Sequence, residues 1–170
     1  MDENIMNVLI LCTGNSARSI MAEGLINVLG AGRLRAHSAG SSPTGRVNPY
    51  AVEQLAAIGY DCDQLRSKSW NEFTQPSAPH MDLVITVCDN AAGELCPLWP
   101  GQPLSIHWGF ADPATVEGSA DDKRAAFHTA FLQIKACVAE LVNLPLENLD
   151  RDTLRLELQR IAAVAEGFRG

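Results

Sequence analysis

The sequence lacks several features that would place it in a specialised class of protein. No apolar run approaches the roughly 20 residues of a membrane-spanning helix, and the first residues lack the basic stretch and cleavage site of a secretory signal. No internal repeat or low-complexity tract is present. Because 170 residues are too few for two ordinary domains, we expect one cytoplasmic domain over residues 1–170, with no membrane partner.

Positive charge is also scarce. The chain has 13 Lys and Arg residues against 20 Asp and Glu residues, which gives a formal net charge of −7. A chain with this balance is not expected to bind nucleic acid or an anionic membrane through its overall field. If the ligand is an anion, a local site must hold it.

Cysteine occurs in an odd number and without the Cys-x-x-Cys spacing of structural zinc sites. An odd count in a chain without a leader does not indicate a disulfide framework. Some of the thiols are therefore interpreted as catalytic or redox groups, with simple burial as the alternative for each. Burial is the favoured interpretation for two that match no motif, Cys62 and Cys137. The five cysteines are Cys12, Cys62, Cys88, Cys96 and Cys137.

Apolar strand-like segments alternate with segments of helical periodicity along the chain. This alternation predicts an α/β fold, a four-stranded parallel sheet with helices on both faces. Ligands of such sheets bind beyond the carboxyl ends of the strands. The expected strands are 7–11, 34–38, 82–87 and 104–108, and the expected helices are 19–30, 48–59, 122–143 and a last one from about residue 150.

The segment "CTGNSARS" (12–19) lies at the carboxyl end of the first expected strand and leads into a helix. Small residues let its backbone N–H groups close around a tetrahedral oxyanion, and the helix start adds positive potential. Asn15 tolerates the left-handed backbone that such a loop needs, and the planar Arg18 guanidinium matches two oxygens of one anion. The predicted substrate-binding residues are Thr13, Gly14, Asn15, Ser16, Ala17, Arg18 and Ser19.

Cys12 lies at the base of this predicted cradle. Helix starts and nearby cations lower thiol pKa values, so we expect the pKa of Cys12 to be depressed and its thiolate to be a nucleophile. Ser19 is expected to hydrogen-bond that thiolate. The alternative is a buried cysteine at a strand end, followed by an ordinary turn.

The segment "VLILCTGNSARSIMAEGL" (8–25) resembles the low-molecular-weight protein tyrosine phosphatase family, and more specifically the arsenate reductases built on that fold. The resemblance implies a sheet of order 2-1-3-4. It also implies that Cys12 is the nucleophile, that Arg18 and the loop amides bind the oxyanion, and that Asp112 of an Asp-Pro loop is the general acid. Further matching segments are "HSAG" (37–40), "VNPYAVEQLAAIGYD" (47–61), "DLVITVCDNAAGELCP" (82–97) and "HWGFADP" (107–113).

Two activities of such families remain to be distinguished. A phosphatase needs one cysteine, whereas a reductase needs thiols that supply two electrons. Cys88 ends the third expected strand and Cys96 follows eight residues later, which suits a thiol relay. Ala114 and Thr115 follow the Asp-Pro pair, where the phosphatases usually carry aromatic residues. Arsenate reduction to arsenite, through Cys88 and Cys96 or an external thiol, is favoured. The alternatives are a phosphomonoester hydrolase and a noncatalytic anion-binding domain.

The resemblance also implies the partners. We expect no cofactor beyond an external thiol reductant, either thioredoxin or glutathione with glutaredoxin, and phosphate or sulfate should compete with arsenate. Some thioredoxin-linked members bind potassium near the loop, and Asn15, Glu23 and Ser38 match three of its ligands. Lys68 lies in the stretch that supplies their acidic ligand. Because its ammonium group brings its own positive charge, we expect no bound metal.

Overall fold

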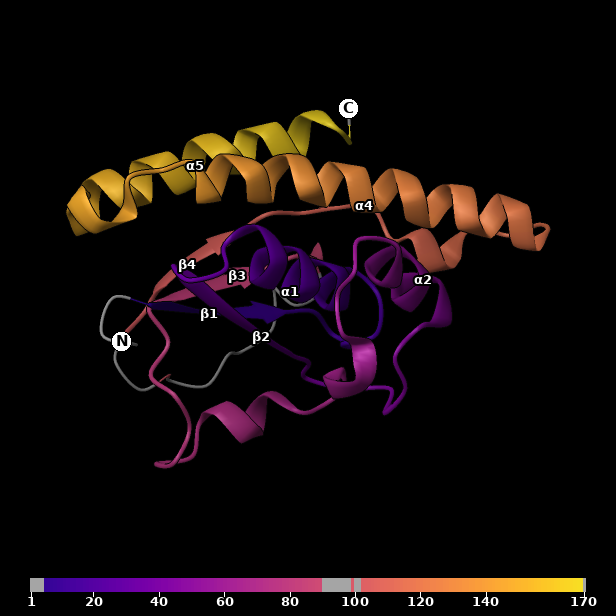
Figure 1. The fold of residues 1–170 in the computed structure, drawn as a ribbon, viewed down its shortest axis with the longest axis horizontal. Helices are drawn as coiled ribbons and strands as arrows, with labels where there is room; N and C mark the ends of the chain where they lie inside the picture. The colour runs from indigo at the N-terminus through magenta and orange to yellow at the C-terminus, as the bar shows by residue number, and fades with distance from the viewer. Residues whose placement is uncertain (1–4, 90–98, 100–101, 170) are drawn as a thin grey trace.

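The computed structural model describes residues 5–89, 99 and 102–169 (Figure 1). Cys96, the last thiol of the predicted relay, lies outside these residues. The described strands form one parallel sheet of order β2-β1-β3-β4, which confirms the predicted topology. The strands are β1 (Met6–Leu11), β2 (Leu34–Ala39), β3 (Leu83–Thr86) and β4 (Leu104–His107).

Three of the four described α-helices begin at a capping side chain, whereas α1 begins after Ala17 without one. The Asn48 side chain accepts from the Tyr50 amide, and Asp150 accepts from the Thr153 amide. Ser119 forms a reciprocal capping box with Asp122, so the long helix begins two residues before its predicted start. The helices are α1 (Arg18–Leu29), α2 (Pro49–Ala57), α4 (Ala120–Val142) and α5 (Arg151–Gly167).

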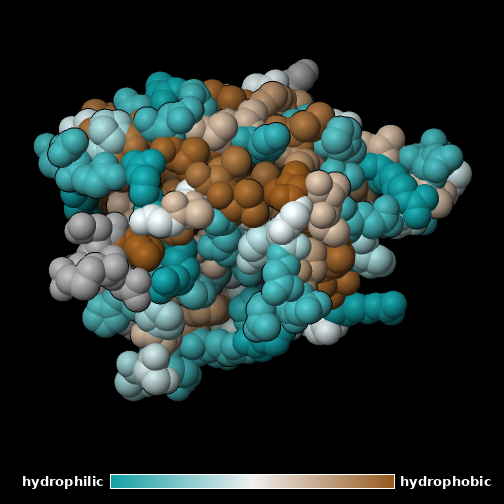
Figure 2. Space-filling view, viewed as in Figure 1, coloured by the Kyte–Doolittle hydropathy of each residue, from teal (hydrophilic) through white to brown (hydrophobic). Residues whose placement is uncertain are grey.

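The two faces of the sheet are covered differently. Val8 and Ile10 share a core cluster with buried residues of α1, α2, α4 and α5, and Figure 1 shows α4 and α5 side by side beyond α1. Leu9 and Leu11 alternate to the opposite face, where Phe73 of the 3-10 helix η3 (Trp70–Phe73) packs on them. Figure 2 shows apolar side chains gathered where α1 lies beneath α4, with hydrophilic residues outside.

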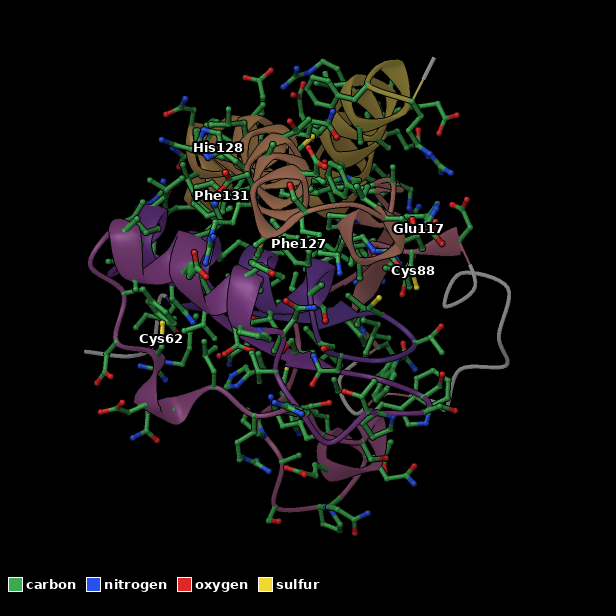
Figure 3. The ribbon with its side chains drawn as sticks, turned by 90° about the vertical axis from the view of Figure 1, so that its right-hand side faces the viewer. Cys62, Cys88, Glu117, Phe127, His128 and Phe131 are labelled. Carbon is green, nitrogen blue, oxygen red and sulfur yellow. The ribbon has the colours of Figure 1, made fainter. Side chains whose placement is uncertain are left out.

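By length and composition alone, one helix among the described residues, α4, is long and apolar enough to cross a membrane. Its buried residues recur at helical spacing, as in the core helix of a folded domain. They pack against α1, α2 and α5, so the apolar face of α4 is part of the core. Figure 3 shows Phe127 and Phe131 on α4.

Candidate active site

The segment between β1 and α1 surrounds a hollow of about 220 Å³ at the carboxyl edge of the sheet. Five of the seven predicted substrate-binding residues line it. Thr13 and Ser19 do not: the Thr13 amide donates to Cys88, and Ser19 Oγ accepts from the buried Asn15 side chain. Thr44 and Ala114 complete the lining and were not predicted. The lining residues are Cys12, Gly14, Asn15, Ser16, Ala17, Arg18, Thr44, Asp112 and Ala114.

Two local features give the loop its shape. Asn15 has a φ of 45°, the left-handed conformation predicted for it. Gly40, at the end of β2, lies so close to the loop that a Cβ there would be 2.4 Å from the Thr13 carbonyl oxygen. The loop is thus pressed against the end of β2, where the Ser42 amide donates to that same carbonyl at 3.0 Å.

Arg18 spans from the loop to the segment after β4. Its Nη1 donates to the Phe110 carbonyl at 2.7 Å, and its Nη2 lies 3.5 Å from Asp112 Oδ2. The Nε atom is buried and has no hydrogen-bond partner among the described residues. A buried donor of this kind is satisfied by an acceptor such as an oxyanion.

Asp112, which the family resemblance implies is the general acid, lines the same hollow. Its Oδ1 accepts from the Ala114 amide at 2.9 Å and thereby caps the 3-10 helix η4 (Pro113–Thr115). Its other oxygen faces Arg18. Asp112 therefore caps a turn and also lines the same hollow as Cys12.

The sheet order brings Cys88 against the base of the loop. Both Cys12 and Cys88 are buried, their side chains hydrogen-bond, and the Thr13 amide donates to Cys88 Sγ at 3.3 Å. The hydrogen bond with Cys88 is the largest cause that raises the pKa of Cys12 above its usual value. Burial and the Cys88 charge add to it, and they outweigh Arg18 and the Gly14 amide, which lower the pKa.

The expectation of a depressed Cys12 pKa is therefore wrong for this arrangement, because it considered the cradle without the second thiol. Coupled thiols lose their protons in two steps that belong to the pair. Arg18 and the Gly14 amide favour the first negative charge on Cys12, whereas the Thr13 amide favours it on Cys88.

We expect Cys88→Ala to lower the pKa of Cys12, because the change removes the largest cause of its elevation. The measurement is the pH dependence of iodoacetamide alkylation at Cys12, followed by peptide mass spectrometry. Cys62→Ala is the control and should leave the inflection unchanged. An inflection in Cys88→Ala that equals or exceeds that of the unmodified protein contradicts this account.

The remaining cysteines of the described residues lie away from the hollow. Cys137 is fully buried on α4, and burial raises its pKa to about 12. Cys62 is half-buried and lies across the molecule from Cys88 (Figure 3). Trp108, which directly follows β4, also does not line the hollow, because it is buried and donates from its indole to the Leu158 carbonyl of α5.

Comparison with known proteins agrees with this geometry. Residues 7–155 match the low molecular weight phosphotyrosine protein phosphatase family. This chain belongs to that family. The arsenate reductase of Halalkalibacterium halodurans is 40% identical to it over 120 residues, which cover 71% of this chain and 83% of that protein.

Two solved structures, one an arsenate reductase and one a phosphatase, resemble the chain to nearly the same extent. An arsenate reductase in the oxidized state has a TM-score of 0.64 at 29% identity, covering 80% of this chain and 95% of that chain. A low molecular weight protein tyrosine phosphatase from T. tengcongensis has a TM-score of 0.63 at 26% identity, covering 85% and 99%. Overall shape therefore does not separate the two activities within the low molecular weight phosphatase family.

A second hollow adjoins the first and was not predicted. It shares Arg18 and Asp112 with the first, has a volume of about 270 Å³, and is also lined by Cys88 and Arg169. Arg169 follows α5, outside the residues matched to the phosphatase family, and its guanidinium contacts both Asp89 carboxylate oxygens at 2.8–2.9 Å. No local pattern in the sequence predicts this pairing, because it joins residues 80 positions apart.

Asp89 also lies 3.0 Å from His107 Nε2. The hydrogen bonds from Arg169 and then His107 lower the pKa of Asp89 to about 2. Asp89 is therefore a carboxylate at neutral pH, and its negative charge stands directly after Cys88 in the chain.

Proposed function

We propose that this protein is an arsenate reductase that converts arsenate to arsenite. The observation that carries the proposal is the contact between two thiols, Cys12 and Cys88, at the base of an oxyanion-sized loop. Hydrolysis of a phosphocysteine needs one thiol, whereas reduction needs further thiols that supply two electrons, and a second protein thiol beside the first can be one of them. The naming of the curated relatives as arsenate reductases supports the same assignment.

In the first step, arsenate binds in the hollow against the loop amides and Arg18. Cys12 attacks arsenic as its thiolate, and an S–As bond forms as one As–O bond breaks. Asp112 gives a proton to the departing oxygen, which leaves as water. The Arg18–Asp112 distance of 3.5 Å puts the acid and the anion-binding group on the same side of the loop.

In the second step, the Cys88 thiolate attacks the sulfur of Cys12. The S–As bond breaks and its electron pair stays with arsenic, which departs as arsenite. The two sulfurs are oxidised to a Cys12–Cys88 disulfide. The hydrogen bond between the thiols supports this step, because sulfurs in contact require little backbone movement to bond.

In the third step, another thiolate attacks Cys88 and releases Cys12. We propose Cys96 for this role, which would leave a Cys88–Cys96 disulfide for thioredoxin. Glutathione with glutaredoxin is the alternative donor, with glutathione replacing one or both of the later thiols. Cys96 lies outside the described residues, so its assignment rests on its spacing from Cys88 in the sequence.

The relay predicts a defined set of products. Reduced protein incubated with arsenate and no other thiol should release one arsenite per chain and end with a Cys88–Cys96 disulfide. Cys96→Ser should stop at Cys12–Cys88, because no resolving thiol remains. Disulfide mapping by mass spectrometry, with arsenite measured in parallel, checks both expectations, and Cys62→Ala is the matched control.

The other outcomes of this experiment are equally informative. Arsenite that forms only when glutathione is added contradicts the three-cysteine relay and favours the glutaredoxin-linked scheme. A protein that makes no arsenite with any donor but hydrolyses an aryl phosphate is a phosphatase. No aromatic side chain is found among the described residues that line the first hollow, which counts against a site built for phosphotyrosine.

A further inference from the structure

Lys68 is a charged residue next to the oxyanion loop, and its side chain is largely shielded from solvent. Its side chain is 9% exposed, and its Nζ lies 3.9 Å from Oε1 of Glu23, whose side chain is 11% exposed. The Lys68 ammonium also donates to the Arg66 carbonyl at 3.2 Å. Removing two ions from water is costly and their attraction often does not repay it, so a pair in this place is poorly explained by stability alone.

The pair is part of a closed circuit with the loop. The Lys68 amide donates to Asn15 Oδ1 at 2.9 Å, and Asn15 Nδ2 donates to Ser38 Oγ at 2.9 Å. The Ser38 hydroxyl in turn donates to Glu23 Oε1, which faces the Lys68 ammonium. Lys68 is therefore linked to Asn15 twice. Its backbone amide contacts Asn15 directly, and its ammonium is linked to Asn15 through Glu23 and Ser38.

Asn15 transmits this arrangement to the site. It is fully buried, it has the left-handed backbone on which the loop depends, and it lines the hollow. Its Nδ2 also donates to Ser19 Oγ at 2.9 Å, so the amide is held at both ends. A change in the charge that faces Glu23 would therefore alter how Asn15 holds the loop that contains Cys12.

The same circuit bears on the potassium site of some thioredoxin-linked relatives. The matching residues here, Asn15, Glu23 and Ser38, do surround one place, but the Lys68 ammonium already faces it. A further cation would be repelled by that ammonium at close range. The described residues therefore do not fit a bound metal ion.

We propose that Lys68 is a built-in cation: its ammonium faces the Glu23 carboxylate, positions Asn15 and the oxyanion loop, and makes the loop independent of an exchangeable monovalent cation. Lys68 is thus a positioning residue. This inference rests on the proposed function only in taking the first hollow as the oxyanion site.

The test compares phosphate binding in KCl, NaCl and choline chloride at equal ionic strength. The unmodified protein should bind phosphate equally well in all three. Lys68→Ala keeps the backbone N–H that holds Asn15 but removes the ammonium, and we expect its phosphate affinity in choline chloride to fall about tenfold. Potassium or methylammonium should restore most of this loss, because either cation can fill the place beside Glu23.

Two further variants keep the test decisive. Lys68→Met fills the space without a charge, so its affinity should fall similarly and no added cation should restore it. Arg66→Met is the matched control, because Arg66 lies in the same segment but pairs with Glu72 at the exposed surface. It should bind phosphate normally in every salt. If Lys68→Ala does not fold, the phosphate affinity of Lys68→Met compared with that of Arg66→Met decides whether the ammonium group is required.

Three results would overturn the inference: potassium dependence in the unmodified protein, normal affinity in Lys68→Met, or a loss in Lys68→Ala that neither cation restores. Phosphate binding requires no turnover, so these results do not depend on arsenate reduction. Absence of phosphate binding in the unmodified protein would instead count against the proposed oxyanion site.

Discussion

Asp112→Asn is expected to slow the first step of arsenate reduction by roughly 10²–10⁴-fold, the range typical for loss of a general acid. Asparagine cannot give a proton to the departing oxygen, but its side-chain oxygen can still accept from the Ala114 amide, the contact that caps η4. The loop should therefore keep its shape. Phosphate should still bind, because Arg18 is retained and the substitution removes a negative carboxylate that faces it.

The measurement is arsenite formed in a single turnover, with phosphate affinity determined in parallel. Asp152→Asn is the matched control, because Asp152 is almost fully exposed on α5 and should leave both quantities unchanged. An unaltered single-turnover rate in Asp112→Asn would remove this residue from the mechanism. Loss of phosphate binding would show that its role is structural.

Arg18→Lys is expected to weaken oxyanion binding and slow reduction together, by about 2–4 kcal/mol, or roughly 30- to 1,000-fold. The Arg18 guanidinium contacts the Phe110 carbonyl with one nitrogen and faces Asp112 with another, and it leaves a buried Nε without a partner among the described residues. A lysine ammonium is a single point of charge and cannot occupy all three positions. Retention of positive charge should therefore not rescue the site.

Phosphate affinity and the rate of arsenite formation, both measured against the unmodified protein, check this expectation. Arg155→Lys on the exposed surface of α5 is the control for a change of arginine to lysine. Near-normal turnover in Arg18→Lys would mean that charge alone suffices, and the predicted bidentate contact would be wrong.

Local chemistry explains why so much of the fold could be predicted. Asn48 with Pro49, and Asp150, mark helix starts because their side chains satisfy amides that a helix leaves free. The apolar strand segments identify a parallel sheet because both faces of such a sheet are buried. The left-handed Asn15 could likewise be predicted, since few residue types tolerate that backbone.

Predictions about titration were less successful, because a pKa depends on neighbours that the sequence does not place. The loop, the helix start and Arg18 all argue for a lowered Cys12 pKa, and each is local in sequence. Cys88 is 76 positions away in the chain but adjacent in the sheet order, and its hydrogen bond reverses the direction of the shift.

The sequence by itself determined the segments of the sheet, the loop that begins at Cys12, and the residue types placed at strand ends, because each depends on neighbours within a few positions. Only the tertiary structure decided which distant groups meet there. Chain folding brings Arg169 to Asp89 and places Lys68 between Glu23 and Asn15. Such contacts follow from packing of the whole chain around the sheet, and electrostatic effects fall off with distance in space rather than with separation in sequence.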